Sequence, residues 1–366
     1  MLSCIHGVDL DERAVEIAKL NLLLKALDGL GETEASGKKV LPNLSLNIRC
    51  GNSLISGSYK EGESGQLNIL DKNSQFKSDI RTLINLKDTF YKTEDNDERE
   101  RIIEDVEINE EKINWYLNED LSLYFKKPEE LKPFNYKVAF CEIFKDGGFD
   151  CVIGNPPYLK ERDNREIFEP ILKTDYKIHH QGKMDYWYYF LHKAIDITKP
   201  YAYIGFITNS YWTKSDGATK LIKRINENLA FKNIVDFDST KIFKEVSGKH
   251  IIHTYIKDNH KGIKCDYIQI DKTDSINSID KSKIIKIKNK DMFRPDGKLS
   301  FEPQYNIFKN VIDLEILYNL SIGVQESPDK ISEEELLASK GNNRFKVNEG
   351  VFVLTKSRSE ERRVGK

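Results

Sequence analysis

Short apolar runs and helical hydrophobic stripes alternate along the first 258 residues of the chain. One strand-like run ends near Asp9, and another, within residues 44–55, ends in a Gly-Asn turn. Further runs fall at residues 149–154, 201–212, 233–238 and 250–258, and we expect the strand at residues 149–154 to be buried. Helical spacing begins at about Asp11, and it recurs over residues 184–200, up to Pro200, and over residues 217–229. Strands that alternate with helices predict an α/β fold with a doubly wound sheet.

Residues 59–132 interrupt this alternation with a charged segment whose apolar residues recur at helical spacing. We predict a helical insertion there, with an acidic face in water. From about residue 270 the pattern changes to short strand-like pieces and loops. This change indicates the beginning of a second domain.

Composition narrows the class of protein. The chain has 366 residues, 39% of them hydrophobic, and no apolar run approaches the ~20 residues that span a bilayer. The start lacks a basic segment followed by an apolar one, so we expect no secretory signal. Five cysteines without Cys-x-x-Cys spacing favour reduced thiols over a zinc site.

Charge is distributed unevenly along the chain. Residues 1–150 carry 20 Lys and Arg against 29 Asp and Glu, whereas residues 151–366 carry 37 against 30. The basic second half suits a polyanionic partner.

Polar groups stand at the ends of two predicted strands, where open α/β sheets keep their active sites. Asp9 ends the first strand, and the tetrapeptide Asn155-Pro156-Pro157-Tyr158 ends the strand at residues 149–154. A carboxylate at a strand tip can accept hydrogen bonds from two ribose hydroxyls. Alternatively, Asp9 only stabilises the first turn of the helix that follows.

The tetrapeptide suits alkylation of an exocyclic amino group. The lone pair of such a nitrogen is delocalised into the ring, and two acceptors aimed at its N–H bonds would stabilise the cation formed as a methyl group arrives. The Asn155 side chain and the Pro156 carbonyl are such acceptors, because proline fixes φ and removes competing donors. Tyr158 offers a face for a planar base. Asn-Pro-Pro is also a common turn, so the alternative is a purely structural role.

The stretch FDCVIGNPPY, preceded by FNYKVAFCEIF, resembles the catalytic motif of amino-group DNA methyltransferases. It is most similar to the adenine-N6 enzymes of single-chain, type IIG restriction–modification systems, over roughly residues 5–258. The resemblance implies a Rossmann-like sheet that binds S-adenosylmethionine, and catalytic roles for Asn155, Pro156, Pro157 and Tyr158. It further implies that the partner is double-stranded DNA with a flipped adenine, that the protein does not associate with a membrane, and that it lies in a prokaryotic cytoplasm.

Three further stretches carry the resemblance. GVDLDERAVEIA resembles the ribose-binding motif, which implies that Asp9 binds the ribose and Leu10 packs on the cofactor adenine. CGNSL resembles the motif at the adenine amino group, which implies Asn52, with Ser53 beside it. IFKEVSGKHIIHTYI resembles the motif whose aromatic residue holds the flipped base. Phe243 is the candidate, with a simple core role as the alternative.

The family's glycine-rich turn and its strand do not precede Asp9 in this sequence. That strand lies between the strands that end at Asp9 and Asn155, so we expect unpaired edges on both and weak binding of S-adenosylmethionine. We expect an interior piece of a longer polypeptide. Its predicted parts are a partial catalytic domain (1–268), the start of a DNA target-recognition region (269–357) and a non-native, adapter-like tail (358–366).

The sequence leaves two other functions open. The first is methylation of a different substrate. Related methyltransferases with the same tetrapeptide act on a protein glutamine or on guanine in ribosomal RNA, although the long insertion favours DNA. The second is an inactive DNA-binding remnant. No acidic cluster indicates a nuclease, and the DNA recognition sequence cannot be read from these residues.

Overall fold

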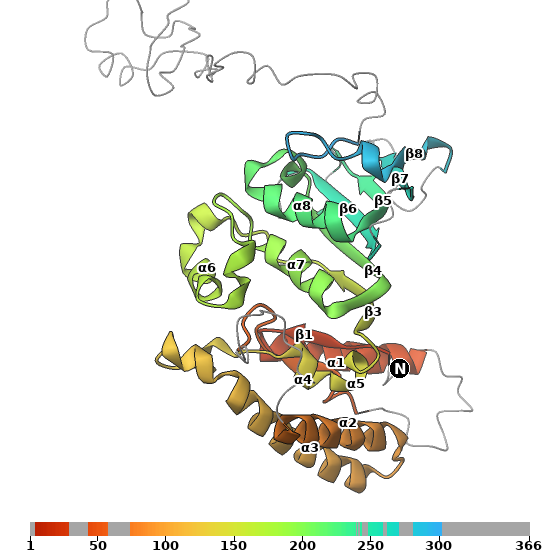
Figure 1. Cartoon of the computed structure of the whole chain (residues 1–366). Coiled ribbons are helices and arrows are strands. Elements are labelled where there is room, and N and C mark those ends of the chain that lie inside the picture. Colours follow the sequence, from red (N-terminus) through yellow and green to blue (C-terminus); the bar gives the residue numbers. More distant parts are fainter. Residues whose placement is uncertain are drawn as a thin grey trace, which may run out of the picture. The chain divides into compact units, whose positions relative to one another are not determined.

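Strands and helices alternate in the computed structural model, which describes residues 4–28, 43–57, 74–238, 240, 242–243, 248–258, 262–270 and 281–301 (Figure 1). The strands are β1 (Gly7–Asp9), β2 (Ile48–Cys50), β3 (Phe149–Gly154), β4 (Thr198–Asn209), β5 (Ala230–Asp236), β6 (His250–Ile256), β7 (Lys264–Gln269) and β8 (Ile285–Lys288). The α-helices are α1 (Glu12–Asp28), α2 (Ser74–Lys92), α3 (Asn96–Leu117), α4 (Tyr136–Ala139), α5 (Cys141–Phe144), α6 (Arg165–Leu172), α7 (Trp187–Ile197) and α8 (Thr219–Asn228). Short 3₁₀ helices are η1 (Glu119–Leu123), η2 (Pro128–Leu131), η3 (Glu161–Asp163), η4 (Asp175–His179), η5 (Tyr211–Lys214), η6 (Asp216–Ala218), η7 (Lys281–Lys283) and η8 (Asn289–Asp291). The α/β prediction is confirmed.

The strands form two separate sheets. β1 and β2 pair in parallel, and the larger sheet has the order β3-β4-β6-β5-β7-β8. Within it, β3 and β4 are parallel, as are β5 and β7, whereas β6 is antiparallel to both of its neighbours. Within the described residues, β1 has only β2 beside it and β3 has only β4. The edges expected to be unpaired are therefore unpaired in this part of the chain.

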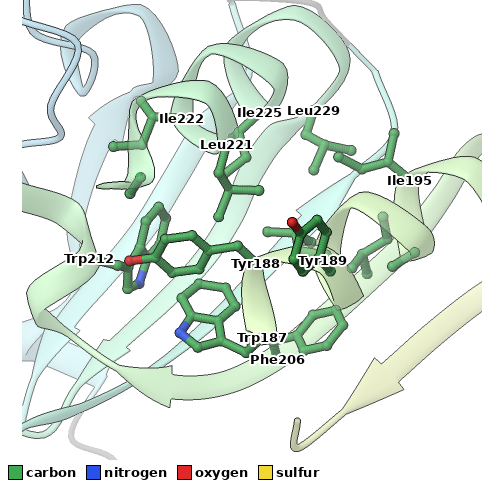
Figure 2. Packing of buried hydrophobic residues seen from close by; sticks show 14 of the residues in the cluster. Trp187, Tyr188, Tyr189, Ile195, Phe206, Trp212, Leu221, Ile222, Ile225 and Leu229 are labelled. Carbon is green, nitrogen blue, oxygen red and sulfur yellow. The ribbon is translucent and has the colours of Figure 1, made fainter. Parts of the chain in front are cut away.

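The main core lies between the six-stranded sheet and the helices α7 and α8. Nearly every side chain of α7 is buried because the helix contacts both β4 and α8. Figure 2 shows Trp187 of α7 beside Phe206 of β4, with the leucine and isoleucine side chains of α8 above them. Trp187 and Trp212 meet edge to face, with ring centres 5.5 Å apart. This core holds the carboxyl ends of β3 and β4 at one rigid edge.

Two local predictions were wrong. The strand at residues 149–154 was expected to be buried, but Ile153 of β3 is 82% exposed, because no described element covers that side of an edge strand. The helix expected over residues 184–200 ends at Ile197, and Pro200 lies inside β4. Proline lacks an N–H for a sheet ladder. It is accommodated where the register between β3 and β4 shifts, between Phe149 and Cys151.

The predicted insertion is helical in its described residues. α2 and α3 pack against each other, and Asp95 caps α3 by accepting a hydrogen bond from the backbone N–H of Glu98 at 2.9 Å. One face of the pair forms a buried cluster with residues before β2 and around α5, including Leu46, Leu83, Phe90, Val106, Ile113 and Cys141. The insertion is therefore packed onto the β1–β2 region.

A buried ionic network also holds the insertion in place. The ammonium of Lys87, on α2, is fully buried, lies 3.0 Å from a Glu110 carboxylate oxygen and 3.5 Å from one of Glu142, and donates to the carbonyl of Ala139. Arg49, in the middle of β2, contacts the other Glu110 oxygen at 2.5 Å. Each buried charge has an opposite charge beside it, as burial requires.

The described residues extend past the domain boundary predicted at residue 268. β7 and β8 continue the six-stranded sheet, and the first compact unit runs from Met1 to Pro303. Residues 302–366 lie outside the described residues, so the recognition region and the adapter-like tail stay predictions. No described helix is long and apolar enough to cross a bilayer, and no group of three metal-ligating side chains occurs in the described ranges.

We predict that Lys87→Ala lowers the free energy of unfolding by about 3–5 kcal/mol, because the buried Glu142 carboxylate loses its cation and the buried Glu110 keeps one of its two, Arg49. Urea denaturation measures the change. The control is Lys145→Ala, which removes a lysine that is 37% exposed and lies 3.0 Å from Asp88; we expect a loss below about 1 kcal/mol. Equal losses in the two variants would contradict a special role for the buried network.

Candidate active site

A cavity of about 560 Å³ opens where the carboxyl ends of β1 and β3 and the turn after β2 meet. Seven of the residues predicted for the site line it: Asp9, Leu10, Asn52, Ser53, Asn155, Pro156 and Pro157. They come from three segments far apart in the sequence. β1 and β2 are parallel, so their carboxyl ends lie at one edge of the smaller sheet, and the carboxyl end of β3, from the larger sheet, lies on the same cavity.

The Asp9 carboxylate accepts a hydrogen bond from the turn that leads into α1, and Asp9 also lines the cavity. One oxygen, Oδ1, accepts a hydrogen bond from the backbone N–H of Asp11 at 2.8 Å, just before α1 begins. Among the described residues, the other oxygen accepts no hydrogen bond. Both interpretations of Asp9 are therefore compatible, since one oxygen orders the turn and the second is available to a ligand.

The turn after β2 is tightly ordered. The side-chain oxygen of Asn52 accepts the N–H of Leu54 at 3.1 Å, while the Asn52 backbone N–H donates to the Lys132 carbonyl at 2.7 Å. Ser53 accepts a hydrogen bond from the Tyr136 hydroxyl at 3.0 Å. Burial raises the pKa of Tyr136, so its hydroxyl remains a donor at neutral pH.

The tetrapeptide turn presents two acceptors. Gly154 precedes it, and a Cβ there would lie 2.8 Å from the Phe206 ring, so glycine lets the turn pack against β4. The Asn155 side chain is exposed at the cavity, whereas Pro156 is buried. No described residue donates a hydrogen bond to the Pro156 carbonyl. A free carbonyl therefore stands next to an exposed amide.

Tyr158 holds this turn rather than lining the cavity. Its hydroxyl lies 2.8 Å from the Ile207 carbonyl of β4 and 3.0 Å from the side-chain oxygen of Asn155. Burial raises the pKa of Tyr158 to about 12, which keeps the phenol protonated. The phenol thus links the turn after β3 to the neighbouring strand.

The ring of His250 lies between Phe243 and Tyr158, and so connects Phe243 to this turn. Phe243 is half-buried and meets His250 edge to face at 5.1 Å, and His250 in turn lies 5.9 Å from the Tyr158 ring centre. The structure therefore brings Phe243 to the same end of the sheet as Tyr158. It is not among the residues that line the cavity.

Lys193 also faces the cavity and was missed from the sequence. This α7 residue is 9% exposed, and its ammonium lies 4.1 Å from the Tyr176 ring centre and 5.9 Å from that of Tyr136. Burial lowers its pKa to about 8, while the Asp196 carboxylate acts in the opposite direction. The available signal was a lysine in a mostly apolar predicted helix, although His192 and Asp196 are also polar there.

Both unpaired strands line the cavity. Gly7 and Val8 of β1 line it, as do Phe149 and Val152 of β3. His6 closes the far end; burial, with a smaller effect from Lys87, lowers its pKa to about 4 and leaves the ring neutral. The site is thus an elongated space between two sheets, with polar groups at one end.

Sequence comparison identifies the class that this mixed α/β fold and site define. The family model "Eco57I restriction-modification methylase" matches residues 3–243. The chain belongs to the Eco57I restriction-modification methylase family, which confirms the resemblance to restriction–modification methyltransferases.

Curated relatives agree with this family. The chain is 24% identical over 297 residues to RM.MjaORFECS2P of Methanocaldococcus jannaschii, a match that covers 64% of this chain and 24% of the relative. It is 26% identical over 265 residues to the type II restriction enzyme and methyltransferase RM.Eco57I of Escherichia coli, covering 71% and 19%. It is 30% identical over 156 residues to the type II methyltransferase M.HincII of Haemophilus influenzae, covering 41% and 31%. The chain therefore spans less than a third of the length of each.

We predict that Tyr158→Phe lowers the free energy of unfolding by about 1 kcal/mol, the usual net value of one hydrogen bond. The ring remains, but the link to Ile207 is lost. Urea denaturation measures the effect against Tyr201→Phe, a control on β4 whose side chain is 69% exposed. A Tyr158→Phe variant as stable as the control would show that the phenol does not hold the turn.

Proposed function

We propose that the chain contributes the catalytic part of a DNA methyltransferase that transfers a methyl group from S-adenosylmethionine to adenine N6 within a restriction–modification system. The observation that carries this proposal is the position of the Asn155 amide and the free Pro156 carbonyl. Both lie at the carboxyl end of β3, on the same cavity as Asp9. Family membership supports the reaction class, and the two acceptors support an amino group as the target.

The two acceptors can take both N–H bonds of one amino group. Hydrogen bonds to these acceptors favour a pyramidal nitrogen and stabilise the positive charge that develops as the new N–C bond forms. No strong base is needed, since the proton leaves a nitrogen that is already cationic. Tyr158 and Phe243 lie at the same end of the sheet as these acceptors, and we propose that their rings contact a planar base.

Asn155 must present its oxygen to the base, and the Tyr158 hydroxyl makes this possible. A phenol carries one proton, yet it lies near two acceptors, the Ile207 carbonyl and the Asn155 oxygen. Donating to Ile207 leaves the phenol oxygen free to accept. If the Asn155 amide turns over, its NH₂ donates to that oxygen, and its carbonyl faces the substrate. Every group is then satisfied.

The residues around the cavity fit S-adenosylmethionine. The unoccupied oxygen of Asp9 suits a ribose hydroxyl, exposed Leu10 offers an apolar surface for the adenine ring, and Asn52 with Ser53 adds polar groups beside it. When bound, S-adenosylmethionine supplies an electrophilic methyl group on sulfur. The protein orients the acceptor amine and disperses its charge.

Duplex DNA is the proposed substrate, with the target adenine flipped out at a cost of a few kcal/mol. The basic second half of the chain supports contacts to phosphates, and such binding should weaken as salt rises. Transfer to a protein glutamine or to RNA guanine is the competing possibility. An assay that offers duplex DNA, ribosomal RNA and protein to the same preparation separates these substrates.

We predict that Asp9→Asn weakens S-adenosylmethionine binding about tenfold, or about 1.4 kcal/mol. Asparagine keeps an oxygen for the Asp11 N–H but loses the second acceptor and the charge. Calorimetry compares this variant with Asp11→Asn, whose carboxylate accepts from the Arg13 N–H instead. Equal affinities for wild type and Asp9→Asn would contradict the assignment.

We predict that Asn155→Ala reduces methyl transfer about 10²–10³-fold, as expected for loss of one group that stabilises transition-state charge. Transfer of a radiolabelled methyl group to duplex DNA provides the measurement, and cofactor binding should stay unchanged. Asn164→Ala is the matched control, because that amide only donates to the Lys160 carbonyl at 3.0 Å. An active Asn155→Ala variant would contradict the proposed chemistry, whereas an inactive wild type would favour the remnant.

A further inference from the structure

Lys160 follows the tetrapeptide turn directly, and its backbone is fixed to the segment before α7. The backbone N–H of Tyr186 donates to the Leu159 carbonyl at 2.7 Å, and Lys160 forms an antiparallel bridge with Asp185. Lys160 is two residues beyond Tyr158, which is at most ~7 Å of extended chain. An exposed lysine is therefore held close to the turn that carries the two proposed acceptors.

The ammonium of Lys160 lies over an exposed aromatic ring. Its nitrogen is 5.1 Å from the centre of the Tyr211 ring, and Tyr211 is 44% exposed. The Tyr211 hydroxyl donates to the buried Asp185 carboxylate, which also accepts from the Asn209 side chain at 3.1 Å. These hydrogen bonds hold the ring in place. Because a ring face attracts a cation, the contact favours one position of the ammonium.

No carboxylate neutralises this ammonium. Among the described residues, Lys160 forms no ion pair, and its ammonium donates no hydrogen bond. Asp185 is the nearest candidate, but its carboxylate is occupied by Tyr211 and Asn209. Burial raises the pKa of Asp185, and the charge of Lys160 is only a minor opposing effect. Lys160 is therefore not positioned as the counter-ion of Asp185.

Two further exposed lysines belong to the same group of segments. Lys183 lies two residues before Asp185, and Lys214 ends η5. Within the described ranges, neither ammonium has an ion-pair partner. The neighbouring Glu161 carboxylate is engaged instead, since it lies 2.7 Å from His180 and accepts the backbone N–H of Lys183 at 2.9 Å. The acidic groups here are occupied within the protein, whereas the positive charges face solvent.

We propose that Lys160 binds a backbone phosphate of the DNA strand that carries the flipped adenine, with Lys183 and Lys214 contacting neighbouring phosphates. This inference rests on the proposed function for DNA as the partner. Phosphate contacts of this kind fix the position of the strand and carry no sequence information. Lys160 thus holds the backbone while the adjacent turn engages the base.

The salt dependence of duplex binding tests this contact, because each phosphate that a lysine neutralises releases counter-ions. Fluorescence anisotropy with a labelled DNA duplex, without cofactor, gives the affinity at each salt concentration. Lys160→Gln should weaken binding about fivefold to tenfold at 0.1 M salt and lower the slope of log affinity against log salt by about 0.9. Lys160→Arg keeps the charge and should keep the slope. A loss of folded protein alone would change the active fraction and not the slope.

Lys264→Gln is the matched control. Lys264 is an exposed lysine at the start of β7, whereas the tetrapeptide turn follows the carboxyl end of a parallel strand, so Lys264 lies at the opposite end of the sheet. Its slope should equal that of wild type.

The inference is overturned if wild type binds no duplex, if Lys160→Gln keeps the wild-type slope, or if Lys264→Gln lowers the slope equally. Tighter binding of a ribosomal RNA hairpin that depends on Lys160 would assign the lysine to the competing substrate and overturn the DNA contact. Methyl transfer tests the proposed function separately: transfer that depends on Asn155 upholds it even when Lys160 makes no contact.

Discussion

The hydrogen bond from Tyr158 to the Ile207 carbonyl is the constraint on which the site depends. It ties the turn after β3 to β4, which packs on the tryptophan-rich core of α7, and the Tyr158 ring packs against that core as well. It acts together with the hydrogen bond from the Tyr186 N–H to the Leu159 carbonyl, at 2.7 Å, just after the turn. Because the turn is held, the Asn155 amide and the Pro156 carbonyl keep fixed positions at the cavity. Preorganised acceptors of this kind stabilise charge without reorganising during the reaction.

The polar residues of the cavity gather at one of its ends. Asp9, Asn52 and Asn155 gather where the strands finish, whereas His6 and Phe149 close the opposite end between the unpaired edges of β1 and β3. The ionic network around Lys87 joins the helical insertion to β2 and α5, and so stabilises the smaller sheet. The geometry of the polar end thus depends on two independent supports, the α7 core under β4 and the α2–α3 pair next to β2.

Local sequence signals predicted the parts of this site that depend on strand ends. Asp9 and Asn155 follow apolar runs, and the rule that α/β folds bind ligands at the carboxyl ends of their strands predicts that both belong to the site. Features set by tertiary context could not be predicted. Ile153 is exposed because no described element packs on its side of β3. Helix α7 ends at Ile197, before Pro200, because β4 already begins at Thr198. Lys193 and His250 resemble ordinary helix and strand residues until rings distant in sequence, Tyr136 and Tyr158, are placed beside them.

The most direct measurement is a crystal structure of the chain with a cofactor analogue and an adenine-bearing oligonucleotide. We predict that the exocyclic nitrogen of the base lies about 2.7–3.2 Å from both the Asn155 side-chain oxygen and the Pro156 carbonyl oxygen. A base bound elsewhere, or one whose amino group faces water while these two oxygens remain without it, would contradict the account.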